Sequence, residues 1–131
     1  MIENVTANSY RPGERDDRPW GDWTVLDASP GYVVKRLRVV PGGRLSLQRH
    51  RYRAERWVVA AGTPTVTLDA ERRTLTPGDA VIIPIRAVHR LENEGAVDAV
   101  IIELQLGDEL REDDIERLDD VYGRADREPV A

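Results

Sequence analysis

Short β-rich runs separated by turn-forming residues are the feature of this sequence that most limits its fold. Val, Ile, Leu, Thr, Tyr and Trp gather in these runs, and Gly, Pro, Asp or Asn separates one run from the next. The runs cover residues 23–27, 31–40, 44–50, 55–60, 63–69, 79–85, 87–93 and 97–106. About eight such strands predict an all-β domain that closes into a jelly-roll barrel.

The composition is that of one globular domain. With 131 residues and 40% hydrophobic content, the chain is large enough to bury a core, and the absence of cysteine excludes disulfides and thiolate chemistry. The net charge of −5 argues against nucleic acid as a partner. No apolar run is long enough for a signal peptide or a membrane span, so we expect a cytoplasmic protein that does not bind membranes.

The two ends of the chain differ from the strand-rich middle. Residues 1–18 are polar and aperiodic, so we expect an N-terminal arm, or an edge strand exchanged with a partner, before a domain covering residues 19–131. An open sheet edge beside such an arm favours a homodimer. Near the C-terminus, Ile115, Leu118 and Val121 recur with helical spacing, which predicts a short helix over residues 112–122.

The only two histidines lie among candidate metal ligands. Because side chains alternate along a strand, Gln48 and His50 share one face, and Glu55 shares parity with inward apolar residues of the next strand. His89 approaches the same interior from a strand remote in sequence. This set of nitrogen and oxygen donors suits a divalent metal ion, with zinc the first choice and manganese, cobalt, nickel or iron also open.

Lys35 is the only lysine in the chain, and its parity within residues 31–40 points it inward with Val33 and Leu37. A desolvated lysine loses its charge more easily than an exposed one, which suits proton transfer or polarisation of a carbonyl oxygen. The alternative is a structural ion pair with an inward carboxylate, for which Glu103 has the right parity. Both interpretations stay open at this point.

The candidate ligands lie inside two motifs that resemble those of the cupins. The first motif consists of Gly42, Gln48, His50, Glu55 and Gly62, with glutamine where many cupins have a first histidine. The second consists of Gly78, Pro84, His89 and Asn93. Arg86 stands where that second motif usually has a glycine. This resemblance implies a cupin jelly-roll barrel.

A closer resemblance extends over nearly the whole chain. The sequence is similar to the C-terminal isomerase domain of type II mannose-6-phosphate isomerases in the segments RPWGDWTVLD, YVVKRLRV, PGGRLSLQRH, RAERWVVAAGT, IIELQLGDEL and EDDIERLDDVYGR. In that family the domain commonly follows a mannose-1-phosphate guanylyltransferase domain. The present sequence shows no Gly-rich phosphate loop opening a helix. It differs from the family at Tyr52 and Arg56, where histidines are usual.

The resemblance implies a metal-dependent isomerase that converts mannose 6-phosphate to fructose 6-phosphate. In this interpretation the metal stabilises the developing oxyanion, Lys35 or Glu103 moves the proton, and Arg53 binds the phosphate. Other arginines near the ligand loop are expected to be solvated. A non-catalytic cupin that binds a sugar or metabolite, and another metal-dependent cupin enzyme, are the alternatives.

Overall fold

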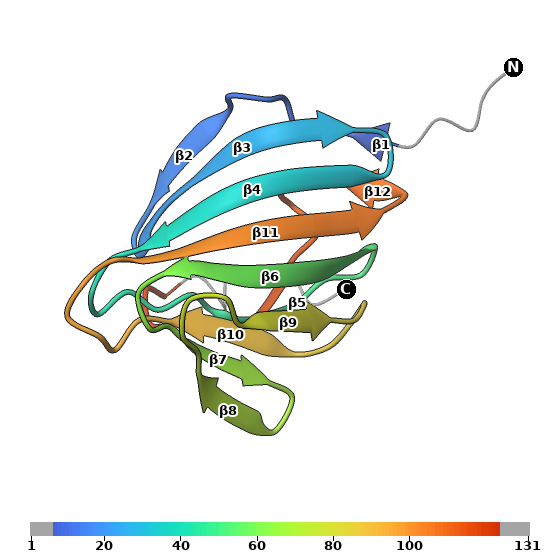
Figure 1. Cartoon of the computed structure of the whole chain (residues 1–131). Helices are drawn as coiled ribbons and strands as arrows, with labels where there is room; N and C mark the ends of the chain where they lie inside the picture. The colour runs from blue at the N-terminus through green and yellow to red at the C-terminus, as the bar shows by residue number, and fades with distance from the viewer. Residues whose placement is uncertain (1–6, 124–131) are drawn as a thin grey trace, which may run out of the picture.

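The computed structural model describes residues 7–123 and consists of β-strands and loops, with no helix in that range (Figure 1). The larger sheet has six strands in the order β2 (Arg15–Arg18), β3 (Gly21–Ser29), β4 (Tyr32–Val39), β11 (Ala99–Gly107), β6 (Arg53–Ala61) and β9 (Ala80–Ile83). The strand pairs of this sheet are antiparallel.

A second antiparallel sheet of five strands lies against the first (Figure 1). Its order is β13 (Glu116–Asp119), β5 (Leu47–Arg49), β10 (His89–Glu92), β7 (Thr65–Leu68) and β8 (Glu71–Thr74). A short parallel pair is formed by β1 (Ala7–Asn8) and β12 (Glu109–Leu110). The predicted all-β jelly roll is therefore confirmed, and each of the eight predicted runs overlaps one of the strands.

Alternation along the strands determines which residues fill the space between the sheets. In β4, Val33, Lys35, Leu37 and Val39 are buried, while the residues between them are partly or fully exposed. The central strands β6 and β11 follow the same period, as expected for strands that are buried on one face. The inner faces therefore carry one apolar core, interrupted by charged side chains on the central strands.

Three inward residues of neighbouring strands form a row across the larger sheet. Glu103 of β11 is paired directly with Lys35 of β4 on one side and with Trp57 of β6 on the other. All three side chains are buried. The register thus brings the chain's only lysine and a carboxylate into the interior at the same level.

The C-terminal segment differs from its sequence prediction. Residues 112–122 form turns and strand β13 instead of the predicted helix, so that prediction is wrong. β13 pairs with β5, and Arg117 is opposite Gln48 in this pairing. Backbone hydrogen bonding to a neighbouring strand outweighs the weak apolar periodicity of the segment.

The predicted N-terminal arm is incorporated into the chain's own sheets where the structure describes it. β2 pairs with β3, β1 pairs with β12, and Tyr10 is buried in the core. Residues 1–6 lie outside the described part, and the boundary at residue 18 stays a prediction. Among the described residues there is no helix long and apolar enough to cross a membrane.

Candidate metal centre

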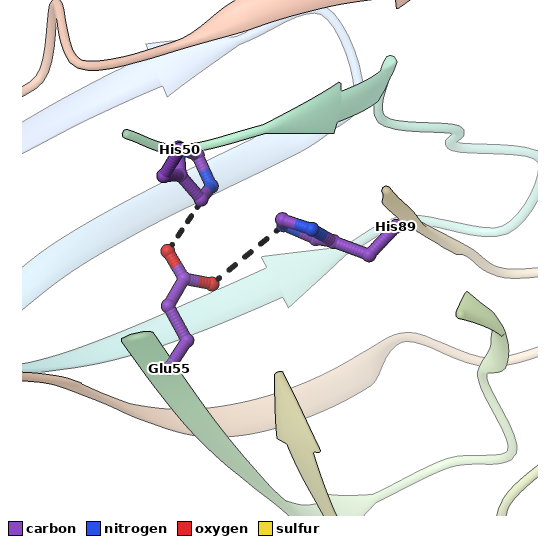
Figure 2. A group of neighbouring side chains, drawn as sticks. All are labelled: His50, Glu55 and His89. Carbon is purple, nitrogen blue, oxygen red and sulfur yellow. Dashed lines mark ion pairs between the residues drawn. The ribbon is translucent and has the colours of Figure 1, made fainter. Parts of the chain in front are cut away.

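Three buried side chains from different strands converge on one point between the sheets (Figure 2). His50 follows the end of β5, His89 begins β10, and Glu55 projects from β6 in the opposite sheet. β5 and β10 are neighbours, with Gln48 directly opposite His89. Closure of the two sheets therefore brings together ligands that are far apart in sequence.

The ligand atoms lie at distances that a single ion spans. Nε2 of His50 is 3.2 Å from Oε2 of Glu55, and Nε2 of His89 is 3.9 Å from Oε1 of the same carboxylate. One ligand atom from each residue lies within 4.8 Å of the others. These three residues could hold a metal ion, which agrees with the predicted use of His50, Glu55 and His89.

Backbone carbonyls orient both imidazoles. Nδ1 of His50 lies 2.7 Å from the carbonyl oxygen of Asp114, and Nδ1 of His89 lies 2.9 Å from that of Ala87. A carbonyl can only accept a hydrogen bond, so each Nδ1 carries the proton and each Nε2 presents its lone pair to the centre. This is the orientation that metal coordination through Nε2 requires.

The electrostatics of the group favour a cation. Burial lowers the pKa of His50 to about 4, helped by the adjacent Arg53, and burial also lowers the pKa of His89. Burial opposes the ionisation of Glu55, but His50, Arg53 and His89 outweigh it and hold the pKa of this carboxyl well below its usual range. Two neutral imidazoles and one carboxylate are a donor set typical of zinc and other divalent ions.

Gln48 lies next to this group, but its role as a fourth ligand stays a prediction. Its side chain is buried, and its amide nitrogen donates to the carbonyl and hydroxyl oxygens of Ser46 at 3.3 Å and 3.0 Å. These two bonds leave the amide oxygen available to a ligand or an ion.

A second carboxyl group lies beside Glu55. The indole N–H of Trp57 donates to both Glu55 and Glu103, at 3.0 Å and 3.1 Å, and Gln105 donates to Glu103 at 2.8 Å. Burial and the neighbouring negative charge of Glu55 raise the pKa of Glu103 to about 8. At neutral pH the pair therefore consists of an ionised and a protonated carboxyl group.

Lys35 binds a different carboxylate from the one expected. Although it is directly opposite Glu103 in the sheet, its Nζ forms an ion pair with Glu112 at 2.9 Å and donates a hydrogen bond to the hydroxyl oxygen of Tyr10 at 3.2 Å. The ammonium also lies 4.0 Å from the ring centroid of Trp23. The structure thus favours the ion-pair interpretation of Lys35, with another partner.

Glu112 and Tyr10 are the site residues that the sequence analysis did not identify. Tyr10 lies in the aperiodic arm and Glu112 in the segment predicted as helix, so neither has a strand parity that could be read from the sequence. Their hydroxyl and carboxylate oxygens lie within hydrogen-bonding distance of each other, at 2.5 Å. Only the return of both chain ends to the same end of the barrel brings them to Lys35.

Arg53 is an internal support of Glu55. Its Nε donates to Oε2 of Glu55 at 2.8 Å, and its Nη1 donates to the carbonyl oxygen of Arg111 at 3.0 Å. The side chain is only 6% exposed. Phosphate binding by Arg53 stays a prediction, whereas the observed bonds show that it fixes the carboxylate of the metal centre.

The pocket above the centre is small and lined by charged residues from both sheets. Its cavity volume is about 60 Å³, which is room for a few water molecules. Cationic side chains of Arg18, Lys35, Arg53 and Arg117 line it together with Glu55, Glu103 and Glu112. A ligand larger than a few water molecules can therefore place only one end beside the candidate metal centre.

The jelly roll and the His50–Glu55–His89 group together define a cupin with a candidate metal centre. A solved structure described as an RmlC-like cupin from Shewanella frigidimarina has the same fold, with a TM-score of 0.68 and 20% identity over 77% of this chain and 87% of that chain. The sequence matches the family described as Mannose-6-phosphate isomerase C-terminal over residues 7–120. The chain therefore belongs to that family.

The similar proteins are longer than this chain, which matches only a part of each. The alginate biosynthesis protein AlgA of Pseudomonas aeruginosa is 51% identical over 82% of this chain and 22% of its own length. The mannose-1-phosphate guanylyltransferase of Escherichia coli K12 is 47% identical over 95% of this chain and 27% of its own length. The chain thus spans about a quarter of the length of these relatives.

These names correct the predicted function. The sequence analysis predicts conversion of mannose 6-phosphate to fructose 6-phosphate, whereas the similar proteins are named for guanylyl transfer to mannose 1-phosphate or for alginate biosynthesis. The names of these relatives therefore contradict the isomerase prediction. Proton transfer in that isomerisation is the role predicted for Lys35 and Glu103, so these roles no longer have a basis. Both residues nevertheless line the pocket.

Proposed function

We propose that this chain is a metal-binding cupin domain that holds one divalent ion and binds a phosphorylated mannose at it, in support of mannose 1-phosphate metabolism. The observation that carries the proposal is the buried group of His50, Glu55 and His89, with both Nε2 atoms facing the carboxylate. Zinc is the first choice for this donor set. Manganese, cobalt, nickel and iron fit the same donors less selectively.

The surroundings of the centre support a hydroxyl-bearing ligand. A bound ion would supply a Lewis acid that coordinates hydroxyl or phosphate oxygens in its open positions. The protonated carboxyl of Glu103 donates its hydrogen bond to Glu55, which supports the ionised form of Glu55 as a ligand of the ion. The narrow pocket suits the hydroxyl end of a sugar better than a complete nucleotide.

The relatives support mannose as the sugar. A protein that is 47% identical over 95% of this chain is named mannose-1-phosphate guanylyltransferase, so mannose 1-phosphate is the first ligand to test. Guanylyl transfer itself is not proposed for this domain, because the matches cover only 22% and 27% of the relatives quoted above.

Metal analysis and calorimetry test the two parts of the proposal. We expect about one divalent ion per chain by elemental analysis, and loss of that ion in the double variant His50→Ala/His89→Ala. Arg73→Ala on the exposed strand β8 is the control, and it should retain the ion. Unchanged metal in the double variant would place the ion elsewhere and remove the proposed site.

For the ligand, mannose 1-phosphate is titrated into zinc-loaded protein and, in parallel, into the double variant. Saturable heat with the first protein and none with the second is the expected result. If glucose 1-phosphate binds equally well, the domain does not select mannose. Equal binding to both proteins would show that the ligand does not use the metal centre.

A further inference from the structure

A second and larger cavity borders the metal centre through His50. It has a volume of about 520 Å³, against about 60 Å³ for the pocket above the metal centre. Residues 49–52, Arg86, Arg111 and residues 113–116 line it. We call this cavity the arginine cleft, because Arg49, Arg51, Arg86 and Arg111 all contribute to its wall.

The acidic residues of the arginine cleft already have partners. Glu116 forms an ion pair with Arg49 at 2.7 Å, and Asp113 forms one with Arg111 at 3.0 Å. The carboxylate of Asp114 accepts the backbone N–H groups of residues 51 and 52, at 2.8 Å and 3.0 Å. Asp113 and Glu116 therefore have arginine partners and Asp114 is bound by backbone donors, while the four arginines of the cleft outnumber its three carboxylates.

Arg51 and Arg86 are the arginines without a carboxylate. Both side chains are exposed, and within residues 7–123 neither forms an ion pair. The whole chain carries a net charge of −5, so a cleft with surplus positive charge does not follow from the overall composition. Guanidinium groups in a concave site are suited to bidentate contacts with phosphate oxygens.

Of these two arginines, Arg86 has an unusual backbone conformation. Its φ is 69°, a left-handed conformation that glycine adopts freely and a long side chain adopts at a cost. Its N–H donates to the carbonyl oxygen of His50 at 2.9 Å, which holds the turn against the cleft. An arginine kept in a conformation that favours glycine points to a use for its guanidinium.

Tyr52 orders the other wall of the cleft. The guanidinium groups of Arg51 and Arg111 lie 5.8 Å and 5.3 Å from the centroid of its ring. Such contacts restrict the guanidinium groups and reduce the entropy that they lose on binding an anion. The cleft is therefore partly organised before a ligand arrives.

We propose that the arginine cleft binds the phosphate group of a small molecule at a site separate from the metal pocket, with Arg51 and Arg86 in direct contact with the phosphate oxygens. A sugar phosphate and a nucleotide share this chemistry. The inference does not depend on metal binding, because neither arginine lines the pocket beside the candidate metal centre.

Titration of inorganic pyrophosphate into the metal-free full-length chain tests this site by calorimetry. Metal is removed first because pyrophosphate itself binds divalent ions. We expect saturable binding that Arg51→Gln and Arg86→Gly each weaken about tenfold or more, since each removes a charged hydrogen-bond donor. Arg86→Gly suits the observed φ, so its fold should persist, and circular dichroism checks this.

Two controls separate the cleft from its surroundings. Arg73→Gln removes an exposed charge on β8, and His89→Ala damages the metal pocket but not the lining of the cleft. Both should bind pyrophosphate as the parent protein does. Absence of binding to the parent protein, equal weakening by Arg73→Gln, or loss of binding in His89→Ala would each overturn the proposal.

Competition with GDP and with mannose 1-phosphate identifies the source of the phosphate. Stronger displacement of pyrophosphate by GDP assigns the cleft to nucleotides, and stronger displacement by mannose 1-phosphate assigns it to sugar phosphates. If neither compound displaces pyrophosphate, the cleft does not bind phosphate esters and the proposal is wrong.

Discussion

Glu55 connects the candidate metal centre with its supports at the scale of single residues. Its carboxylate contacts both histidines, accepts from Arg53 and Trp57, and is almost completely buried. The carboxylate thus has two roles, as a candidate metal ligand and as the counter-charge of the buried guanidinium of Arg53. Removing its charge should affect metal binding and folding together.

Glu55→Gln should lower zinc affinity at least about tenfold and destabilise the metal-free protein by about 3 kcal/mol, because Arg53 is left buried without its counter-charge. Isothermal calorimetry and urea unfolding measure the two effects. Glu116→Gln is the matched control, since its partner Arg49 is partly exposed and the pair contributes at most about 1 kcal/mol. Equal destabilisation by both variants would contradict the role of Glu55.

The raised pKa of Glu103 predicts a pH dependence of stability. Glutamate ionises near pH 4.5 in the unfolded chain, but the pKa in the folded protein is about 8. Between these values the folded state binds more protons, so this group makes the free energy of unfolding fall with rising pH, by at most about 1.4 kcal/mol per pH unit. The loss is complete above the folded pKa.

Urea unfolding of metal-free protein at several pH values between about 5 and 9 measures this effect. Glu103→Gln should make the slope less negative across that window, because glutamine has no proton to lose. Glu94→Gln, which changes an exposed carboxylate, should keep the slope of the parent protein. Parallel curves for the parent and Glu103→Gln would show that Glu103 does not ionise with a raised pKa.

At the scale of elements, the segment between β12 and β13 closes the barrel end over the metal centre. Asp114 is the residue that fixes it, because its carboxylate holds two backbone N–H groups of the loop after β5 and its carbonyl oxygen orients His50. The loop and the closing segment are therefore coupled through one buried side chain. The orientation of His50 therefore depends on this contact between distant segments.

Asp114→Ala should lower the free energy of unfolding by about 2 kcal/mol, because two backbone donors lose their acceptor. It should also reduce zinc affinity about tenfold by loosening His50. Thermal unfolding and zinc titration provide the two readings. The neighbouring Asp113→Ala, which changes a side chain 82% exposed, should change neither, and similar effects of both variants would contradict the assigned role.

At the scale of the whole molecule, the sheet edges differ in character. The outermost strands β2 and β8 carry mostly charged side chains, whereas β9 contains the exposed Ile82. Charged edge strands resist pairing with another chain, and an apolar edge strand invites it. The predicted homodimer is therefore expected to form along β9.

Light scattering should give the mass of a dimer for the parent protein, and Ile82→Lys should shift it toward the monomer because it places a charge on the apolar edge. Arg73→Lys on β8, which keeps its charge, is the control and should remain dimeric. A monomeric parent protein at micromolar to millimolar concentration would remove the homodimer prediction.

The sequence alone determined which residues face the interior of the barrel. A period of two is a local property, so the eight strand runs, the inward direction of Lys35 and Glu103, and the four candidate ligands could all be derived from spacing and motifs. The positive φ at Arg86 also agrees with its place at a glycine position of the motif.

Only the tertiary structure decided which of these inward groups meet. Lys35 pairs with Glu112 rather than Glu103, and Asp114 orients His50, because the chain ends return to the barrel by long-range strand pairing. Residues 112–122 have a weak helical pattern in isolation, yet they form turns and a strand because β5 offers unpaired backbone groups. Contacts of this kind depend on closure of the sheets and leave no periodic signal in the sequence.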